Sequence, residues 1–211
     1  MKSANELISP LHRDEVGRAA DLLAAALHDD PGWRHVVPDP AARQTALRGI
    51  TKVALRDGLA YGGVLAARQA DRLCGVAVWM PPGSFPMSRH RRMRSLPAMV
   101  SLATRVPGDI RDLARFGASI EAAFPLEPVW YLQVLGVHPA ARGQGLGRHL
   151  LQPILTLADR TGAACYLETA RPRNKAYYEA VGFRISSPAA QLVPGGPCMI
   201  RMVRPAAGRT P

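Results

Sequence analysis

A glycine-rich turn behind an apolar run is the part of the sequence whose residue types best suit anion binding. The run Val129–Val137 is rich in β-branched and aromatic residues and predicts a buried strand, which His138 and Pro139 end. Apolar residues at helical spacing begin at Leu146, so a helix is expected after the turn. Glycines let backbone N–H groups converge, and a helix N-terminus adds a partial positive charge. The segment therefore predicts a pyrophosphate site.

The spacing of the glycines narrows the choice of pyrophosphate ligand. A dinucleotide fingerprint would need a third glycine where Arg148 stands, and a Walker loop would need a lysine after a glycine. Arg142 and Arg148 flank the turn and could neutralise phosphate oxygens. The remaining pattern, Arg-x-x-Gly-x-Gly at Arg142, Gly145 and Gly147, resembles the coenzyme A loop of the GNAT N-acetyltransferase family. An ordinary turn before a helix is the alternative.

A second stretch carries a more specific resemblance. Asn174–Phe183 matches the second coenzyme A motif of that family, N-x-x-(F/Y)-Y-E-x-x-G-F. The resemblance implies that Tyr178 is a general acid, since a phenol with an ordinary pKa of about 10 can protonate a departing thiolate. Asn174 would cap the helix, bond to the cofactor, or do both. Tyr177 is assigned to the cofactor site, with core packing as the alternative.

Acetyl transfer also requires a held thioester and a donor for its oxygen. If the strand 129–137 splays from its parallel neighbour, backbone groups of Leu135, Gly136 and Val137 would pair with pantetheine amides. An N–H near Leu135 would then face the thioester oxygen. Gly136 fits a bulge, a close backbone approach, or a glycine packed under a neighbour.

The proton acceptor is expected at the end of the strand predicted over Ala163–Thr169. Glu168 stands there, at the edge where the sites of open α/β sheets gather. It would accept the ammonium proton, directly or through water, or else it would hold Arg171, Arg173 or a loop N–H. Gln133 cannot act as a base but would orient a water or the acceptor.

The loop after the first predicted helix, which ends near His28, is a candidate for contact with the acceptor. The stretch Asp29-Asp30-Pro31-Gly32-Trp33 predicts a turn. In the family this loop borders the acceptor pocket, so the resemblance implies that Trp33, His35 and the Asp29/Asp30 pair meet a cationic substrate. A capped loop with a packed tryptophan is the alternative.

A long helical segment separates the third and fourth expected strands. Phe85–Phe124 predicts two helices, about 87–105 and 109–123, split at Pro107-Gly108. A compact acetyltransferase core needs only a short connection there. We therefore expect the insertion 85–124 to form one wall of the acceptor pocket and to set specificity. The basic run Ser88–Arg94 favours a solvated helix face over a polyanion site.

The combined motifs resemble puromycin N-acetyltransferase-like members of the family over the last third to two-fifths of the chain. This resemblance implies an α/β fold of the α+β kind, with a mixed, mostly antiparallel, twisted sheet of about seven strands flanked by helices. A V-shaped splay is expected between the fourth and fifth strands. One domain would span 1–204, with its coenzyme A core at about 129–183 and a flexible tail at 205–211.

The resemblance also implies the reaction and its participants. Acetyl-CoA would be the cosubstrate, without a metal, and a primary amine of a small molecule would attack it directly in a ternary complex. A monomer or a homodimer is expected. The positions assigned to coenzyme A are Leu135, Gly136, Val137, Arg142, Gly143, Gln144, Gly145, Leu146, Gly147, Arg148, Asn174 and Tyr177. An acyl-CoA-binding module without turnover is the alternative, but the presence of Tyr178 and Glu168 favours the enzyme.

Composition bears on the remaining classes of function. A net charge of +11 and a pI near 10.6 would suit an arginine-rich nucleic-acid binder. The basic residues are spread along the chain, however, so no nucleic-acid partner is expected. Three distant cysteines outside any C-x-x-C pattern predict reduced, mostly buried thiols, a cytoplasmic location and no zinc site. With no apolar run of about 18 residues and no apolar signal core, we expect a cytoplasmic protein without a membrane partner.

Overall fold

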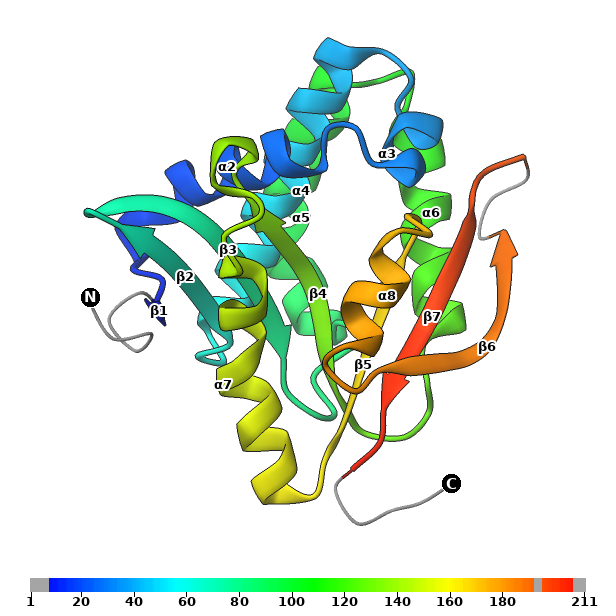
Figure 1. Ribbon diagram of the computed structural model, residues 1–211. Coiled ribbons are helices and arrows are strands. Elements are labelled where there is room, and N and C mark those ends of the chain that lie inside the picture. Colours follow the sequence, from blue (N-terminus) through cyan, green and yellow to red (C-terminus); the bar gives the residue numbers. More distant parts are fainter. Residues whose placement is uncertain (1–7, 192–194, 207–211) are drawn as a thin grey trace.

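A seven-stranded mixed sheet forms the centre of the computed structural model, which describes residues 8–191 and 195–206 (Figure 1). Its strand order is β1-β2-β3-β4-β5-β7-β6. The pair β4 and β5 is parallel and the other neighbouring pairs are antiparallel, which confirms the expected α+β fold. The strands are β1 (Ile8–Pro10), β2 (Val64–Gln69), β3 (Arg72–Met80), β4 (Val129–Val137), β5 (Ala164–Thr169), β6 (Arg184–Gln191) and β7 (Cys198–Arg204).

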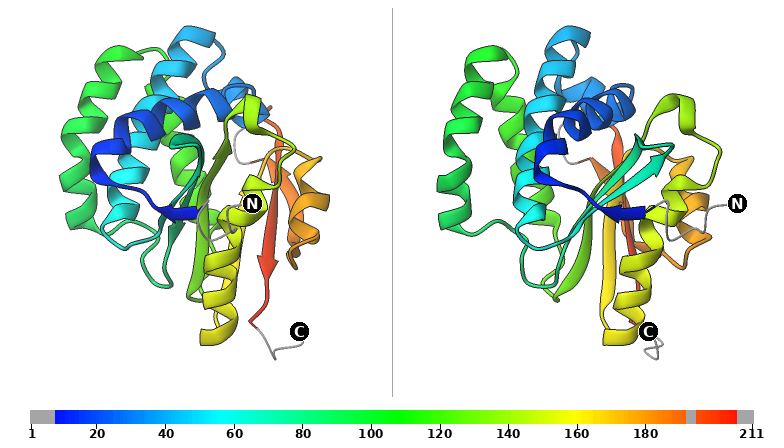
Figure 2. Two further views of the ribbon diagram at one scale, coloured as in Figure 1. Left: turned by 60° about the vertical axis from the view of Figure 1, so that its left-hand side comes forward. Right: turned by 90° about the vertical axis from the view of Figure 1, so that its left-hand side faces the viewer.

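Helices cover both faces of this sheet (Figure 2). The helices are α2 (Val16–Leu27), α3 (Pro31–Val36), α4 (Pro40–Leu59), α5 (Arg89–Arg105), α6 (Ile110–Ala123), α7 (Leu146–Thr161) and α8 (Asn174–Glu179), with short 3-10 turns η1 (Arg13–Glu15) and η2 (Pro139–Ala141). Leu150 and Leu151 of α7 pack with the fully buried Trp79 on one face. Leu23 of α2 and Leu55 of α4 pack on the other.

The strands β4 and β5 separate after a short parallel pairing. Val129–Tyr131 pairs with Ala164–Tyr166, and beyond these residues β4 continues beside β3 while β5 continues beside β7. The V-shaped splay expected between the fourth and fifth strands is confirmed. It leaves the C-terminal half of β4 with a neighbouring strand on one side only.

A bulge at Gln133 sets which side chains of β4 face which layer. Leu132 pairs with Trp79 and Val134 with Val78, so Gln133 has no partner on β3. After the bulge, Leu135 and Val137 pack against the core under α7. Gly136 lies under α2, where a Cβ atom would come within 2.6 Å of Leu23 Cδ2. Of the roles considered for Gly136, close packing under a neighbour is the one observed.

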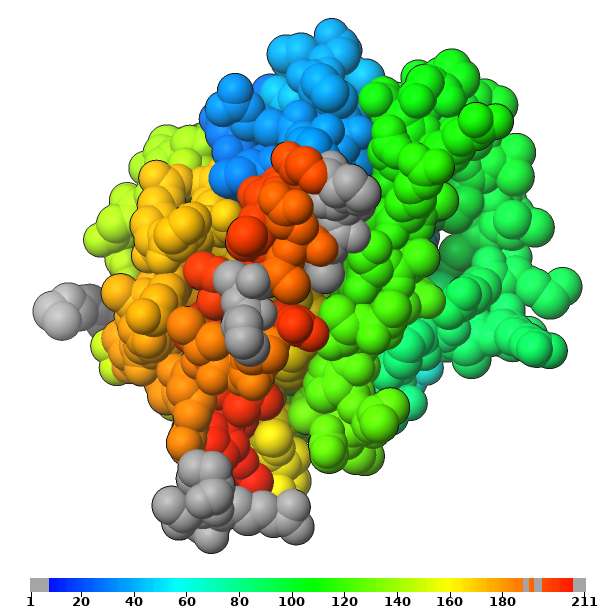
Figure 3. Space-filling model, turned by 90° about the vertical axis from the view of Figure 1, so that its right-hand side faces the viewer, coloured from blue at the N-terminus to red at the C-terminus, as the bar shows by residue number. Residues whose placement is uncertain are grey.

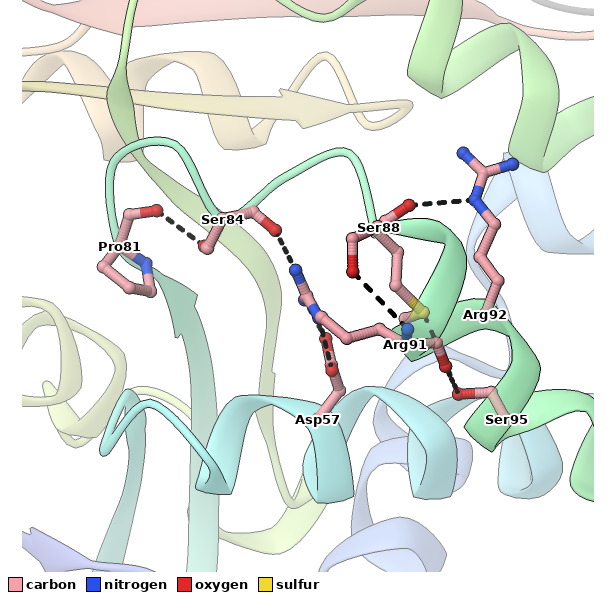
Figure 4. Close-up of polar contacts among 8 residues, drawn as sticks. Asp57, Pro81, Ser84, Ser88, Arg91, Arg92 and Ser95 are labelled. Carbon is pink, nitrogen blue, oxygen red and sulfur yellow. Dashed lines mark hydrogen bonds and ion pairs between the residues drawn. The ribbon is translucent and has the colours of Figure 1, made fainter.

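The insertion between β3 and β4 folds as the two expected helices, α5 and α6. Arg91 fastens the start of α5 to α4: its Nε donates to Asp57 Oδ1 (2.9 Å), its Nη2 to Asp57 Oδ2 and its Nη1 to the Ser84 carbonyl (Figure 4). The Arg91 guanidinium also lies 4.9 Å from the centre of the Tyr61 ring. Leu102 and Phe116 bury the other faces of the two helices.

Two local expectations differ from the structure. The predicted turn at Asp29–Trp33 instead leads into the helix α3, because Asp30 accepts the Gly32 N–H (3.0 Å) and Pro31 stands at the first helical position. Of the three cysteines, only Cys165 is buried, while Cys198 is exposed. The expected tail at 205–211 lies partly outside the described residues.

Two negative findings apply to residues 8–191 and 195–206. No helix among them is both long and apolar enough to cross a membrane. No three of their His, Cys, Asp or Glu side chains are grouped so that they could hold a metal ion.

Candidate active site

The turn between β4 and α7 has the backbone conformation that its glycines predict. Gly143 (φ +80°) and Gly145 (φ +74°) adopt left-handed conformations, which side chains with a Cβ disfavour. The α7 helix begins directly afterwards at Leu146, so the free N–H groups of its first turn lie next to the glycines. Arg142 donates from Nη2 to the Ala26 carbonyl (3.1 Å) and thereby joins the turn to the end of α2.

A cavity of about 550 Å³ lies between this turn, the end of β4 and α8. It brings together most of the residues expected to bind coenzyme A. Its lining includes Leu135, Gly136, Val137, Arg142, Gly143, Gly145, Leu146, Gly147, Asn174, Tyr177 and Tyr178. Gln144 and Arg148 do not line it: Gln144 accepts a hydrogen bond from the Gln69 side chain (2.7 Å), and Arg148 is exposed.

Two arginines that were not expected to bind coenzyme A also line this cavity. Arg171 and Arg173 border it, and together with Arg142 they line an adjoining hollow of about 520 Å³. Three guanidinium groups around neighbouring hollows favour a polyanionic ligand. The signal for this role in the sequence is the run Arg-Pro-Arg directly before Asn174.

Asp30 and Arg171 form an ion pair at the edge of the cavity. Arg171 Nε donates to Asp30 Oδ2 (3.1 Å), while Asp30 Oδ1 accepts the Gly32 N–H. Both carboxylate oxygens of Asp30 therefore have partners within the chain, and Arg171 holds Asp30 rather than Glu168. Trp33 does not line the cavity, and its ring packs on Phe116 of α6 with centroids 5.5 Å apart.

The helix α8 places two tyrosines against the cavity. Asn174 is the first residue of α8 rather than its cap, and its Nδ2 donates to Thr169 Oγ1 of β5 (3.0 Å). Tyr178 is buried between Tyr177 and Phe183. Burial raises the pKa of Tyr178 well above its usual value, and the nearby Tyr177 and Asp30 raise it further. Burial likewise raises the pKa of Tyr177 to about 12. Both phenols are therefore protonated at neutral pH.

Glu168 has an environment that favours proton transfer near neutral pH. Its Oε1 is enclosed and has no hydrogen-bond partner among the described residues. Burial raises the pKa of Glu168 to about 7, while the Tyr166 and Tyr131 hydroxyls and Arg201 act in the opposite direction. Glu168 and Gln133 belong to the strands β5 and β4 that form the splay, and neither lines the 550 Å³ cavity.

Comparison with known proteins agrees with this geometry. Residues 117–183, which include the turn, β5 and α8, match the model of the Acetyltransferase (GNAT) family. A Corynebacterium glutamicum protein described as a histone acetyltransferase and related acetyltransferase is 24% identical, with a TM-score of 0.72 and coverage of 97% of this chain and 98% of that chain.

Two insect enzymes share the fold at lower identity. A Drosophila melanogaster polyamine N-acetyltransferase has a TM-score of 0.62 at 16% identity, covering 93% of this chain and 98% of that chain. An Aedes aegypti arylalkylamine N-acetyltransferase has a TM-score of 0.56 at 14% identity, covering 94% and 97%. The match to the family model therefore covers residues 117–183, which carry the glycine turn and α8, and the likeness to solved structures shows the same fold over nearly the whole chain.

Proposed function

We propose that this protein is a GNAT N-acetyltransferase, which transfers the acetyl group of acetyl-CoA to a primary amine of a small molecule by direct attack within a ternary complex. One observation carries the proposal: a single cavity joins the glycine turn, the unpaired side of β4 and the buried Tyr178. Its domain would be the single unit 1–204 expected from the sequence.

The residues around the cavity suit the parts of coenzyme A. The N–H groups of the turn and of the first turn of α7 would bind the diphosphate, with Arg142 supplying charge. The pantetheine amides would pair with Leu135, Gly136 and Val137, because β5 does not pair with this half of β4. An N–H near Leu135 would stabilise the oxygen of the attacked thioester.

The proton transfers follow from the two perturbed pKa values. The amine nitrogen forms a bond to the thioester carbonyl carbon, and the carbon–sulfur bond breaks. Glu168, with a pKa of about 7, is a base that is half ionised near neutral pH and accepts the ammonium proton. Tyr178, whose pKa is raised, keeps its proton until the leaving thiolate takes it. The second proton leaves the nitrogen after it has bonded to the carbonyl carbon and returns to the Tyr178 oxygen, so a neutral coenzyme A thiol and an acetamide are the products.

The acceptor is proposed as a small molecule because of the motifs shared with the puromycin N-acetyltransferase-like subgroup. Fold neighbours named for polyamine and arylalkylamine acetylation support the same class at 14% and 16% identity. The insertion α5–α6 would form one wall of the acceptor pocket, since Trp33 and Phe116 connect α3 to α6 beside the sheet.

A thiol-release assay with acetyl-CoA and a panel of primary amines tests the proposal. We expect release of coenzyme A that depends on the amine, with acetamide formation detected by mass spectrometry. The competing function is an acyl-CoA-binding module without turnover. Thermal stabilisation by coenzyme A, with no thiol release on any amine, would establish that module and contradict the proposal.

A further inference from the structure

Several buried polar atoms near the splay have no hydrogen-bond partner among the described residues. They are Gln133 Oε1, Tyr166 Oη, Glu168 Oε1, Ser187 Oγ and Arg201 Nε. Buried polar groups in folded proteins are nearly always hydrogen-bonded, so each such atom calls for an explanation. A cluster of both donors and acceptors points to a polar ligand that pairs with them.

The strand register places three of these side chains in one row and a fourth on the same face. Glu168 of β5 lies directly opposite Arg201 of β7, and Arg201 lies opposite Ser187 of β6. Residues directly opposite each other share a face of the sheet, with Cβ atoms about 4.5–5.5 Å apart. Tyr166, two residues before Glu168, lies on the same face.

This face of the sheet borders the insertion. The ring of Phe124, directly after α6, contacts Tyr131 and Tyr166 with centroids 5.1 and 5.3 Å apart. Figure 3 shows α6 running beside β6 and β7, with α3 above them. The row therefore lies on the side of the sheet that faces the proposed acceptor wall, opposite the core under α7.

Arg201 brings a permanent positive charge next to the proposed base. A guanidinium stays protonated in proteins and binds a carboxylate through two parallel hydrogen bonds. The salt bridges between described residues do not include one between Arg201 and Glu168, and Arg201 Nε is unpaired. An anionic group of the acceptor would supply the missing partner of Arg201 Nε.

The surroundings of the Asp29/Asp30 pair reduce its ability to attract a cationic acceptor. Asp30 is held by Arg171 at 3.1 Å, and Asp29 is exposed beside His28. The cationic substrate expected from the sequence therefore lacks a free buried carboxylate at that loop. An acceptor with a negative group matches the charge of Arg201 better.

We propose that the accepted amine carries a carboxylate a few bonds from its amino group, as in an amino acid, and that Arg201 binds this carboxylate while Glu168 receives the amine proton. The inference rests on the proposed function and names its class of acceptor. The acceptor's amino group and carboxylate must be only a few bonds apart because Glu168 and Arg201 pair directly across β5 and β7. A long polyamine lacks the anionic group.

Matched acceptors test this specificity. For small, aliphatic and aromatic side chains, thiol release is measured with the amino acid, its carboxamide and the corresponding decarboxylated amine. We expect kcat/KM to be roughly 10- to 100-fold higher for the amino acid, because the carboxylate forms charge-assisted hydrogen bonds. Calorimetry of the amino acid with enzyme saturated by coenzyme A gives the same preference without turnover.

The variant Arg201→Met should abolish the preference. The ratio of kcat/KM for the amino acid to kcat/KM for its carboxamide should fall toward one, whereas a change shared by both acceptors reflects the loss of the Arg201 charge beside Glu168. Arg201→Gln repeats the test if the first variant is unstable. Arg184→Met is the matched control, because Arg184 is exposed on the neighbouring strand β6. Equal rates on all three acceptors, with Arg201→Met changing them alike, would overturn the inference but leave the proposed function standing. Coenzyme A binding without acetylation of any acceptor would overturn both.

Discussion

Gly147 of α7 and Tyr177 of α8 approach so closely that no side chain fits between them. A Cβ atom on Gly147 would lie 2.6 Å from the Tyr177 hydroxyl oxygen. The two motifs proposed to bind coenzyme A, which are distant in the sequence, therefore meet at this contact, and both residues line the cavity. The glycine is needed here for close approach, whereas Gly143 and Gly145 are needed for their backbone angles.

Gly147→Ala should weaken coenzyme A binding and lower stability by about 1–3 kcal/mol, because the added methyl group displaces the Tyr177 ring. Calorimetry and thermal unfolding measure the two effects. Gly117→Ala on α6 is the control, since its Cβ meets nothing within 4 Å. Adding Tyr177→Phe to Gly147→Ala should restore part of the loss. Full affinity in the single variant would contradict the contact.

The rate should rise with pH through the pKa of Glu168. With that pKa at about 7, the carboxylate form that accepts the amine proton grows as pH increases across neutrality. In kcat/KM profiles this limb should disappear in Glu168→Gln, together with roughly 100- to 10,000-fold of activity. An unchanged acid limb in Glu168→Gln would remove Glu168 from the role of base.

The same ionisation affects stability. Because the pKa of Glu168 is raised in the folded protein from 4.5 to about 7, folding favours its protonated form. Its contribution is fully present below the unfolded value and is lost as pH rises through about 7. Denaturant unfolding at pH 5 and pH 8 should therefore show a smaller stability loss with pH in Glu168→Gln than in the wild type. A loss of equal size would mean that the carboxyl titrates normally.

Tyr178→Phe should lower kcat far more than it raises the Kd for acetyl-CoA. Its hydroxyl is proposed to protonate the thiolate, a role that contributes roughly 100- to 10,000-fold. Tyr177→Phe is the matched control, because both rings line the cavity and only Tyr178 is buried. Rates and equilibrium binding separate the two effects. If Tyr178→Phe turned over at the wild-type rate, Tyr178 would have no part in the mechanism.

Arg91→Met should loosen the insertion from α4. The variant leaves the largely buried Asp57 without its partner, so we expect a loss of about 2–4 kcal/mol in unfolding free energy. The unfolding free energy of Arg94→Met, at an exposed neighbouring position, should stay within about 0.5 kcal/mol of the wild-type value.

Exchange of residues 85–124 for those of a relative should change acceptor preference and leave acetyl-CoA affinity intact. Unchanged preference would contradict the role of the insertion.

The elements around the proposed cofactor site were largely predictable from sequence, because they are built from local backbone patterns. The glycine turn, the strand before it and the helix after it are contiguous, and Asn174–Phe183 is a compact motif. The pairing of Asp30 with Arg171 was not predictable, since it joins residues from distant elements. The same holds for the row formed by Glu168 and Arg201, which depends on the register of β5 and β7.

The position of the bulge in β4 could not be predicted from the sequence, for a different reason. Gly136 looked like the place for an irregularity because it lacks a side chain, but the bulge lies at Gln133. What fixes it is the need to pack Tyr131 on one face and Leu135 under α7 on the other, which only the folded layers reveal. The helix α3 was missed for a local reason: Asp30-Pro31 is both a turn signal and a helix start.

Calorimetric titration of the folded protein with coenzyme A and with acetyl-CoA tests the central claim most directly, namely that the turn between β4 and α7 binds the diphosphate. We predict saturable heat with both ligands and a roughly 5- to 100-fold weaker affinity in Gly145→Ala, which strains a backbone at φ +74°. Gly83→Ala, at φ +75° and outside the cavity lining, should be similarly strained yet bind normally. Absence of heat with either ligand, or equal affinity in Gly145→Ala and the wild type, would contradict the claim.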